Sequence, residues 1–231
     1  MQQNNQISFQ LDKSVTVEHE QYFSKHGVIQ FKNFIDRQTV SLFVSEINNV
    51  QKYLLDNKAE KVNGIPLKFG TDIDGSTLIQ RIAFTSQYSS VLSNFLKSER
   101  IQSVVKLLGS YEGRIGENEK DGLVVNHYIN TDESKFRQLG WHTDSPRDLF
   151  LGSRILPMLN AGLHLDDCPK SNGGLRVLAG THTQGLFKLF FKKKYFIDNT
   201  PDEMKPVLIS KQVILPFMMD AYGTVFSNRH I

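Results

Sequence analysis

The sequence predicts an α+β fold in which supporting helices come first and a jelly-roll-like barrel, a double-stranded β-helix, follows. Three observations predict it. Apolar residues recur at helical spacing in the first half of the chain. From about residue 123 onward they gather instead into short β-like runs. Clusters of Gly, Pro, Asn and Asp separate these runs, as turns between strands require.

The composition limits the class of protein and the kinds of partner to be expected. The 231 residues are 39% hydrophobic and 22% charged, which is enough apolar material for a substantial core. We expect a single domain over residues 1–231, because no repeat or low-complexity linker marks a boundary. The formal charge of +3 and the pI of 8.8 are mild, so nucleic acid is not expected as a partner.

The single cysteine, Cys168, cannot form a disulfide within the chain, which fits a reducing compartment. The first residues carry no signal-peptide pattern, and no window is long and apolar enough to span a bilayer. We therefore expect a cytoplasmic protein with no membrane partner. The sequence leaves the oligomeric state open.

The first elements are two helices with a strand between them. Residues 17–26 predict a short helix that ends at Gly27, and residues 28–31 predict a strand. Asp36 is a good N-cap for a long second helix. The apolar residues of that helix are Val40, Phe43, Val44, Ile47, Val50 and Leu54.

The middle of the chain carries weaker signals. Residues 57–90 are rich in Lys, Asn, Gly and Asp and are expected to be mainly loop, with one strand near 78–82. Such an insertion is either a lid over a site or a variable surface excursion. Residues 98–109 predict a helix that covers the outside of the barrel. The β-like runs that follow are 123–130, 158–165, 175–178, 212–215 and 224–226.

The strongest chemical signal is His142-Thr143-Asp144. On an extended backbone the side chains at i and i+2 point the same way, so this imidazole and carboxylate could meet one metal ion. One further His would complete the two-His-one-carboxylate set that suits non-haem Fe(II) oxygenases. Taken alone, a turn in which Asp144 caps backbone groups explains the same residues.

The order of several motifs resembles the phytanoyl-CoA dioxygenase family of Fe(II)/2-oxoglutarate oxygenases. The helix, glycine and strand of residues 22–36 resemble the opening of that family. His142-Thr143-Asp144 is followed, as in the family, by a strand, an acidic loop, an Asn-Gly turn and a strand that ends in Ala179-Gly180-Thr181-His182, where Ala179 replaces the usual Pro. The resemblance covers roughly residues 17–231.

This resemblance implies a cupin-like barrel that uses Fe(II), 2-oxoglutarate and O₂ to hydroxylate a small organic molecule. His142 and Asp144 would be metal ligands, and Asp144 favours hydroxylation because halogenating relatives replace this carboxylate with a small residue. His182 would belong to a structural turn. Asn126 and Tyr128 alternate on the strand before the metal motif and could hydrogen-bond 2-oxoglutarate, although cross-strand packing explains them equally well.

The third metal ligand is ambiguous. Aligning Val225 and Phe226 with the family's Gly-Asp-x-Val-x-Phe strand places the ligand one position beyond Ile231. Either the chain lacks its C-terminal strands and the ligand lies in the next residues, or the register slips by two and His230 is the ligand. In the family an Arg that binds 2-oxoglutarate follows this histidine. Arg229 precedes it and is not assigned that role.

Other histidines and one basic run have simpler explanations. We expect His164, on an apolar strand, to be a wall residue, and His19 and His26 to lie on the surface of the first helix. His127 could face either way. The run 187–196 mixes lysines with aromatics, so it either attracts an acidic or CoA-bearing substrate or forms an amphipathic surface.

Two other functional classes stay open. The first is a catalytically incomplete jelly-roll protein that binds or regulates. The second is a cupin-like metalloenzyme of another type, such as an isomerase or a cofactor-independent dioxygenase.

Overall fold

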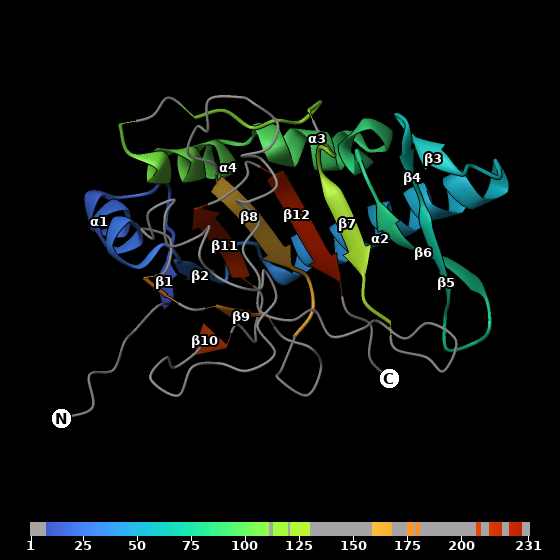
Figure 1. The fold of residues 1–231 in the computed structure, drawn as a ribbon, viewed down its shortest axis with the longest axis horizontal. Helices are drawn as coiled ribbons and strands as arrows, with labels where there is room; N and C mark the ends of the chain where they lie inside the picture. The colour runs from blue at the N-terminus through green and yellow to red at the C-terminus, as the bar shows by residue number, and fades with distance from the viewer. Residues whose placement is uncertain are drawn as a thin grey trace, which may run out of the picture.

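A computed structural model describes residues 8–110, 113–119, 121–129, 159–167, 175–177, 179–180, 207–208, 213–218 and 222–227, with the last three segments and Arg176 described by their backbone only. Within these residues the dominant element is one eight-stranded sheet with the strand order β1-β2-β11-β8-β12-β7-β6-β5 (Figure 1). Its strands are β1 Ser8–Gln10, β2 Gln30–Lys32, β5 Lys68–Thr71, β6 Thr77–Ile82, β7 Val124–His127, β8 Leu159–His164, β11 Val213–Met218 and β12 Tyr222–Ser227.

The sheet is mixed rather than antiparallel throughout. β12 runs parallel to both of its neighbours, β7 and β8, and β1 runs parallel to β2. The remaining pairs of the large sheet are antiparallel. Two short antiparallel pairs accompany it, β3 Lys61–Val62 with β4 Ile65–Pro66 and β9 Arg176–Val177 with β10 Val207–Leu208. The described residues thus confirm a fold of helices and sheets, while the closure into a jelly-roll barrel stays a prediction.

The first helix, α1, spans Val17–His26 as predicted. Gly27 follows it in the left-handed conformation with φ 68°, where a residue without Cβ costs least. The prediction that His19 is a surface residue is wrong, because the residue is only 7% exposed. The Thr16 backbone N–H donates to His19 Nδ1 at 3.2 Å, and Thr16 Oγ1 accepts from the His19 N–H, so the ring completes a capping box. His26 is half-buried and stacks on Tyr22.

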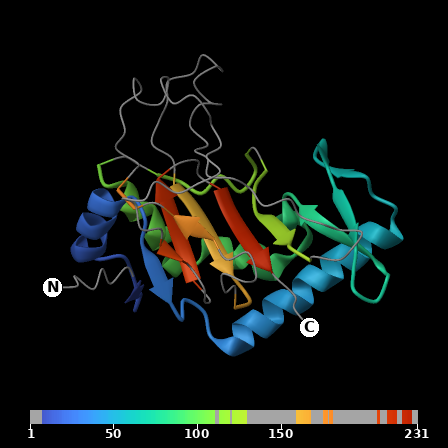
Figure 2. The same cartoon turned by 60° about the horizontal axis from the view of Figure 1, so that its bottom comes forward.

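The second helix, α2, spans Arg37–Asp56 and begins at the predicted cap. Asp36 Oδ1 accepts a hydrogen bond from the Thr39 N–H at 2.7 Å, which satisfies one of the free donors of the first turn. The buried residues of α2 are Phe43, Ile47, Val50 and Leu54, all four of them in the predicted apolar set. Figure 2 shows α2 running along one side of the sheet.

Two shorter helices complete this layer. α3 Ser90–Lys97 is absent from the sequence prediction, and the predicted helix over 98–109 divides into α4 Glu99–Val104 and a 3₁₀ turn, η2 Val105–Leu108. Another 3₁₀ turn, η1, spans Thr85–Tyr88. Ser89 and Ser98 cap α3 and α4 with their hydroxyl oxygens.

The main hydrophobic core lies between these helices and the sheet. Phe31 of β2, Val125 of β7 and Leu163 of β8 meet the buried sides of α2, α3 and α4 there. The residues of α2, α3 and α4 in this cluster are Phe43, Ile47, Leu92, Leu96, Ile101 and Val104. One face of the sheet is therefore the helix face. We call the opposite face, which Figure 1 shows from the front, the distal face.

Residues 57–90 contain far more regular structure than predicted. They form the β3–β4 hairpin, whose turn carries Asn63 and Gly64 at positive φ, and the β5–β6 pair at the edge of the large sheet. Val62, Leu67, Ile79 and Ile82 pack with the end of α2 in a second core cluster. The segment extends the sheet, so the expectation of a mainly irregular loop is wrong.

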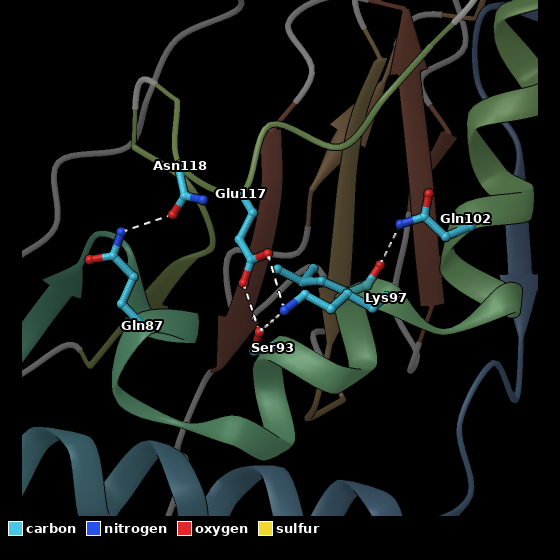
Figure 3. A network of polar contacts seen from close by, with 7 residues as sticks. Gln87, Ser93, Lys97, Gln102, Glu117 and Asn118 are labelled. Atoms are coloured by element: carbon cyan, nitrogen blue, oxygen red, sulfur yellow. Dashed lines mark hydrogen bonds and ion pairs between the residues drawn. The ribbon is translucent and has the colours of Figure 1, made fainter.

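A polar network fixes the segment that enters β7 (Figure 3). Ser93 Oγ of α3 donates to Glu117 Oε1 at 2.9 Å, and Lys97 Nζ donates to Ser93 Oγ at the same distance. Gln87 Nε2 donates to Asn118 Oδ1 at 3.1 Å. These contacts hold residues 113–119 against η1 and α3, and therefore fix where β7 begins.

No helix among the described residues has the length and apolar character that crossing a membrane requires.

Candidate functional site

The strand β7 separates two environments. Leu123 and Val125 pack into the core under the helices, and His127 and Ile129 line a small pocket on the same helix face. Because side chains alternate along a strand, Asn126 and the residue two positions later leave the sheet on the distal face. That residue is Tyr128, directly after β7. The two predicted cofactor-binding residues thus share one face.

Asn126 belongs to a row of residues that crosses four strands. It pairs with Arg81 of β6 on one side and with Phe226 of β12 on the other, and Phe226 pairs with His164 of β8. Residues directly opposite one another in a ladder share a face of the sheet. The row therefore places the buried Asn126 directly beside Arg81, with His164 two strands away on the other side.

Tyr128 is a neutral hydrogen-bonding group at any ordinary pH. Burial raises the pKa of its phenol to about 12, although the nearby positive charge of Arg81 acts in the opposite direction. Tyr128 therefore lies near enough to Arg81 for the charge of the guanidinium to act on its phenol. The phenol can therefore donate a hydrogen bond to an anionic or carbonyl oxygen.

His164, which the sequence predicts to be a wall residue, is buried in the sheet. It ends β8, and the residue is 3% exposed. Leu159 and Leu163 of the same strand pack into the helix-side core, so alternation puts His164 on the distal face. Burial lowers the pKa of its imidazole to about 4, so the ring is neutral at neutral pH.

Arg81 is the polar residue of this face that the sequence prediction did not single out. Its Nη2 donates to Asp121 Oδ2 at 2.5 Å, and both side chains are about one-third exposed, at 32% and 36%. The sequence does contain a signal for Arg81, because this charged residue interrupts the apolar strand predicted near 78–82. A charged residue inside such a run faces the side away from the core, but its partner Asn126 follows only from the register.

His127 has its place on the helix face. Its Nδ1 lies 2.9 Å from the Ile79 carbonyl oxygen. The small pocket that it lines also carries Asn48 and Gln51 of α2 and Asp72 from the β5–β6 turn. The sheet separates this pocket from Asn126 and Tyr128, so His127 is not part of the distal-face cluster.

The predicted metal ligands His142, Asp144 and His230 lie outside the described residues, as do His182, Cys168 and the basic run 187–196. In the chain, His142 and Asp144 fall between β7 and β8, the two strands that contribute Asn126 and His164 to the distal face. Among the residues that the structure describes, no group of three or more His, Cys, Asp or Glu side chains is arranged to hold a metal ion.

Comparison with known proteins gives one result. The family model described as phytanoyl-CoA dioxygenase (PhyH) matches residues 23–211, which is most of the chain and includes β7, β8 and the His142-Thr143-Asp144 motif. A search among curated proteins finds no match. The match confirms the resemblance seen in the order of the sequence motifs. The chain therefore belongs to the phytanoyl-CoA dioxygenase (PhyH) family, whose members are typically oxygenases.

Proposed function

We propose that this protein is an Fe(II)/2-oxoglutarate-dependent dioxygenase that hydroxylates a small organic molecule. The observation that carries the proposal is the family match over residues 23–211, because it includes His142 and Asp144 at the spacing that metal ligation requires. The finer fold assignment belongs to the same proposal: the eight-stranded sheet is one layer of a jelly-roll barrel, with α2, α3 and α4 on its outside.

The proposed metal ligands are His142, Asp144 and one further histidine, for which His230 is the candidate within this sequence. Two imidazoles and one carboxylate suit Fe(II) and leave coordination positions for other molecules, so the donor chemistry fits the metal. Asp144 supports hydroxylation in particular, because it supplies the carboxylate that halogenating relatives lack. When bound, Fe(II) and 2-oxoglutarate supply the oxidation, in which one atom of O₂ enters succinate and the other enters the substrate.

The distal face fits the cosubstrate as well. 2-Oxoglutarate carries two carboxylates and a ketone, so its site needs hydrogen-bond donors that stay in one protonation state. The amide of Asn126 does not titrate, and Tyr128, with a pKa of about 12, keeps its proton. Asn126 lies in β7 and Tyr128 directly follows it, and β7 is held by its pairing with β6 on one side and β12 on the other. We assign them the role of orienting 2-oxoglutarate.

Anaerobic titration of the purified protein tests this assignment. Addition of Fe(II) and then 2-oxoglutarate should produce the visible charge-transfer absorption of a metal that binds a 2-oxo acid. His142→Ala and Asp144→Ala should abolish it, whereas His26→Ala, a substitution in the half-buried histidine of α1, should leave it unchanged.

Absence of the absorption in the wild-type protein would contradict the proposal. If such a protein still bound a small molecule tightly, the catalytically incomplete binding protein of the same fold would be the better description.

A further inference from the structure

The position of Arg81 in the sheet is unusual for a charged residue. It lies inside β6 between Gln80 and Ile82, which are 5% and 0% exposed. Its guanidinium leaves the strand on the distal face, opposite Asn126 and close enough to Tyr128 to influence its pKa. A cation at this place is therefore part of the same face as the proposed cosubstrate residues.

Asp121, the ion-pair partner of Arg81, is held firmly by its backbone. The Phe84 N–H donates to the Asp121 carbonyl oxygen at 2.8 Å, and the Thr85 N–H donates to the Leu123 carbonyl oxygen at 2.9 Å. Gly122, with φ 59°, packs so tightly that an added Cβ would lie 2.4 Å from the Glu117 carbonyl oxygen. A carboxylate on such a support fixes the guanidinium in one orientation.

As a stabilising contact alone, this ion pair would contribute little. Both side chains are about one-third exposed, and pairs of this kind typically stabilise by roughly 0–1 kcal/mol. The bond to Asp121 uses Nη2, whereas a guanidinium carries five N–H donors in a planar fork. The fork therefore has more donors than this bond to Asp121 uses.

Three hydrogen-bonding side chains leave the chain on this part of the distal face: Arg81, Asn126 directly opposite it, and Tyr128 two residues after Asn126. They come from β6, from β7 and from the residue after it, so the ladder between these strands sets their spacing. A fixed cation flanked by neutral donors is the arrangement that recognises a carboxylate, because each oxygen can accept several charge-assisted hydrogen bonds.

We propose that Arg81, positioned by Asp121, anchors a carboxylate of a small-molecule ligand on the distal face. This rests on the proposed function for the identity of the ligand. The carboxylate belongs either to the far end of 2-oxoglutarate or to an acidic substrate, and both sources present the same chemistry to the guanidinium.

The test measures binding of glutarate, a plain dicarboxylate, to the full chain without metal by titration calorimetry or ligand-observed NMR. Arg81→Met should weaken binding by about tenfold or more, which is the loss expected for a charge-assisted hydrogen bond, and Arg81→Lys should weaken it less. The control is Arg114→Met, which removes the same charge from the exposed Arg114–Glu119 ion pair and should change binding by less than about twofold.

A second variant tests the proposal if Arg81→Met does not fold. Asp121→Asn leaves the guanidinium in place and removes only its support, so glutarate binding should persist and become at most several-fold weaker. Three results would overturn the proposal: no glutarate binding by the wild-type chain, equal binding by wild type, Arg81→Met and Arg81→Lys, or an equal loss in Arg114→Met.

Competition identifies the source of the carboxylate. If 2-oxoglutarate with Fe(II) under anaerobic conditions displaces glutarate, and Arg81→Met removes the preference for 2-oxoglutarate over 2-oxopentanoate, Arg81 binds the far carboxylate of the cosubstrate. If glutarate binds together with 2-oxoglutarate and still requires Arg81, it occupies the substrate's place. A third result would show that the proposed function is wrong and this inference is right. In that case glutarate binding would still depend on Arg81, but the protein would show no metal-dependent turnover.

Discussion

Arg81 of β6 and Asn126 of β7 lie directly opposite each other in an antiparallel ladder, so their side chains share the distal face of the sheet. Tyr128 follows two residues after Asn126 on the same face and senses the charge of Arg81. The register between two strands thus joins residues that are 45 and 47 positions apart in the sequence. It adds Arg81 to the pair of residues that alternation along the chain already placed on one face.

Asn126→Ala should raise the KM for 2-oxoglutarate by about tenfold and change kcat less, because the lost hydrogen bond to a charged ligand acts mainly on binding. The matched control is Asn48→Ala, which removes the same amide from the pocket on the helix face. That variant should keep the wild-type KM. Equal KM values in all three proteins would show that Asn126 is a packing residue.

His164 should make folding stability depend on pH in a defined window. The folded pKa is about 4 and the ordinary value is 6.5, so the neutral ring favours the folded state. Its contribution is complete above pH 6.5 and is lost as the pH falls towards 4, by up to about 3 kcal/mol in the free energy of unfolding. Urea denaturation across this range should show a shallower pH dependence for His164→Gln.

The remaining slope in His164→Gln should have the same sign, because burial also lowers the pKa of His19. A wild-type protein as stable at pH about 4 as at pH about 7 would contradict a buried neutral His164.

Tyr128 should stay protonated in the folded protein well above the usual range for a phenol. With a pKa of about 12, it adds nothing to the tyrosinate absorbance between pH about 9 and 10.5. Wild type and Tyr128→Phe should therefore give the same spectrophotometric titration in this range while folded. In a denaturant the two curves should separate by the absorbance of one tyrosine, and separation in the folded proteins would place Tyr128 in solvent.

Gly122→Ala should destabilise the protein and loosen the support of Asp121. Both the positive φ of 59° and the short contacts of the added Cβ with Glu117 and Phe84 act against it. Gly64→Ala is the control, since Gly64 has φ 81° but open space around it. We expect the free energy of unfolding to fall by about 1 kcal/mol in the control and by roughly 1–3 kcal/mol more in Gly122→Ala. Thermal denaturation measures both changes.

Local signals predicted the first half of the fold well where they were strong. The cap at Asp36, the apolar period of α2 and the Gly27 stop of α1 are properties of neighbouring residues, so the sequence displays them directly. His19 misled the prediction because a capping box usually carries Glu or Gln at this position. Here the imidazole ring fills that role and then packs against Phe9 and Phe31.

Elements that form only by pairing with distant residues could not be predicted from local sequence patterns. β3 and β4 have two residues each, too few to show any period, and they exist because the Asn63-Gly64 turn pairs them. β1 has three residues and forms only against β2. The same limit applies to the site: alternation in the sequence put Asn126 and Tyr128 on one face, whereas Arg81 joins them only through the β6–β7 register.

The most direct test of the proposed function is the turnover of 2-oxoglutarate itself. Aerobic incubation of the full chain with Fe(II) and 2-oxoglutarate, alone and with a panel of small organic acids and neutral molecules, should release succinate. His142→Ala should abolish the release, and omission of Fe(II) should do the same. A wild-type protein that binds Fe(II) yet forms no succinate with any member of the panel, or a His142→Ala variant as active as wild type, would contradict the account.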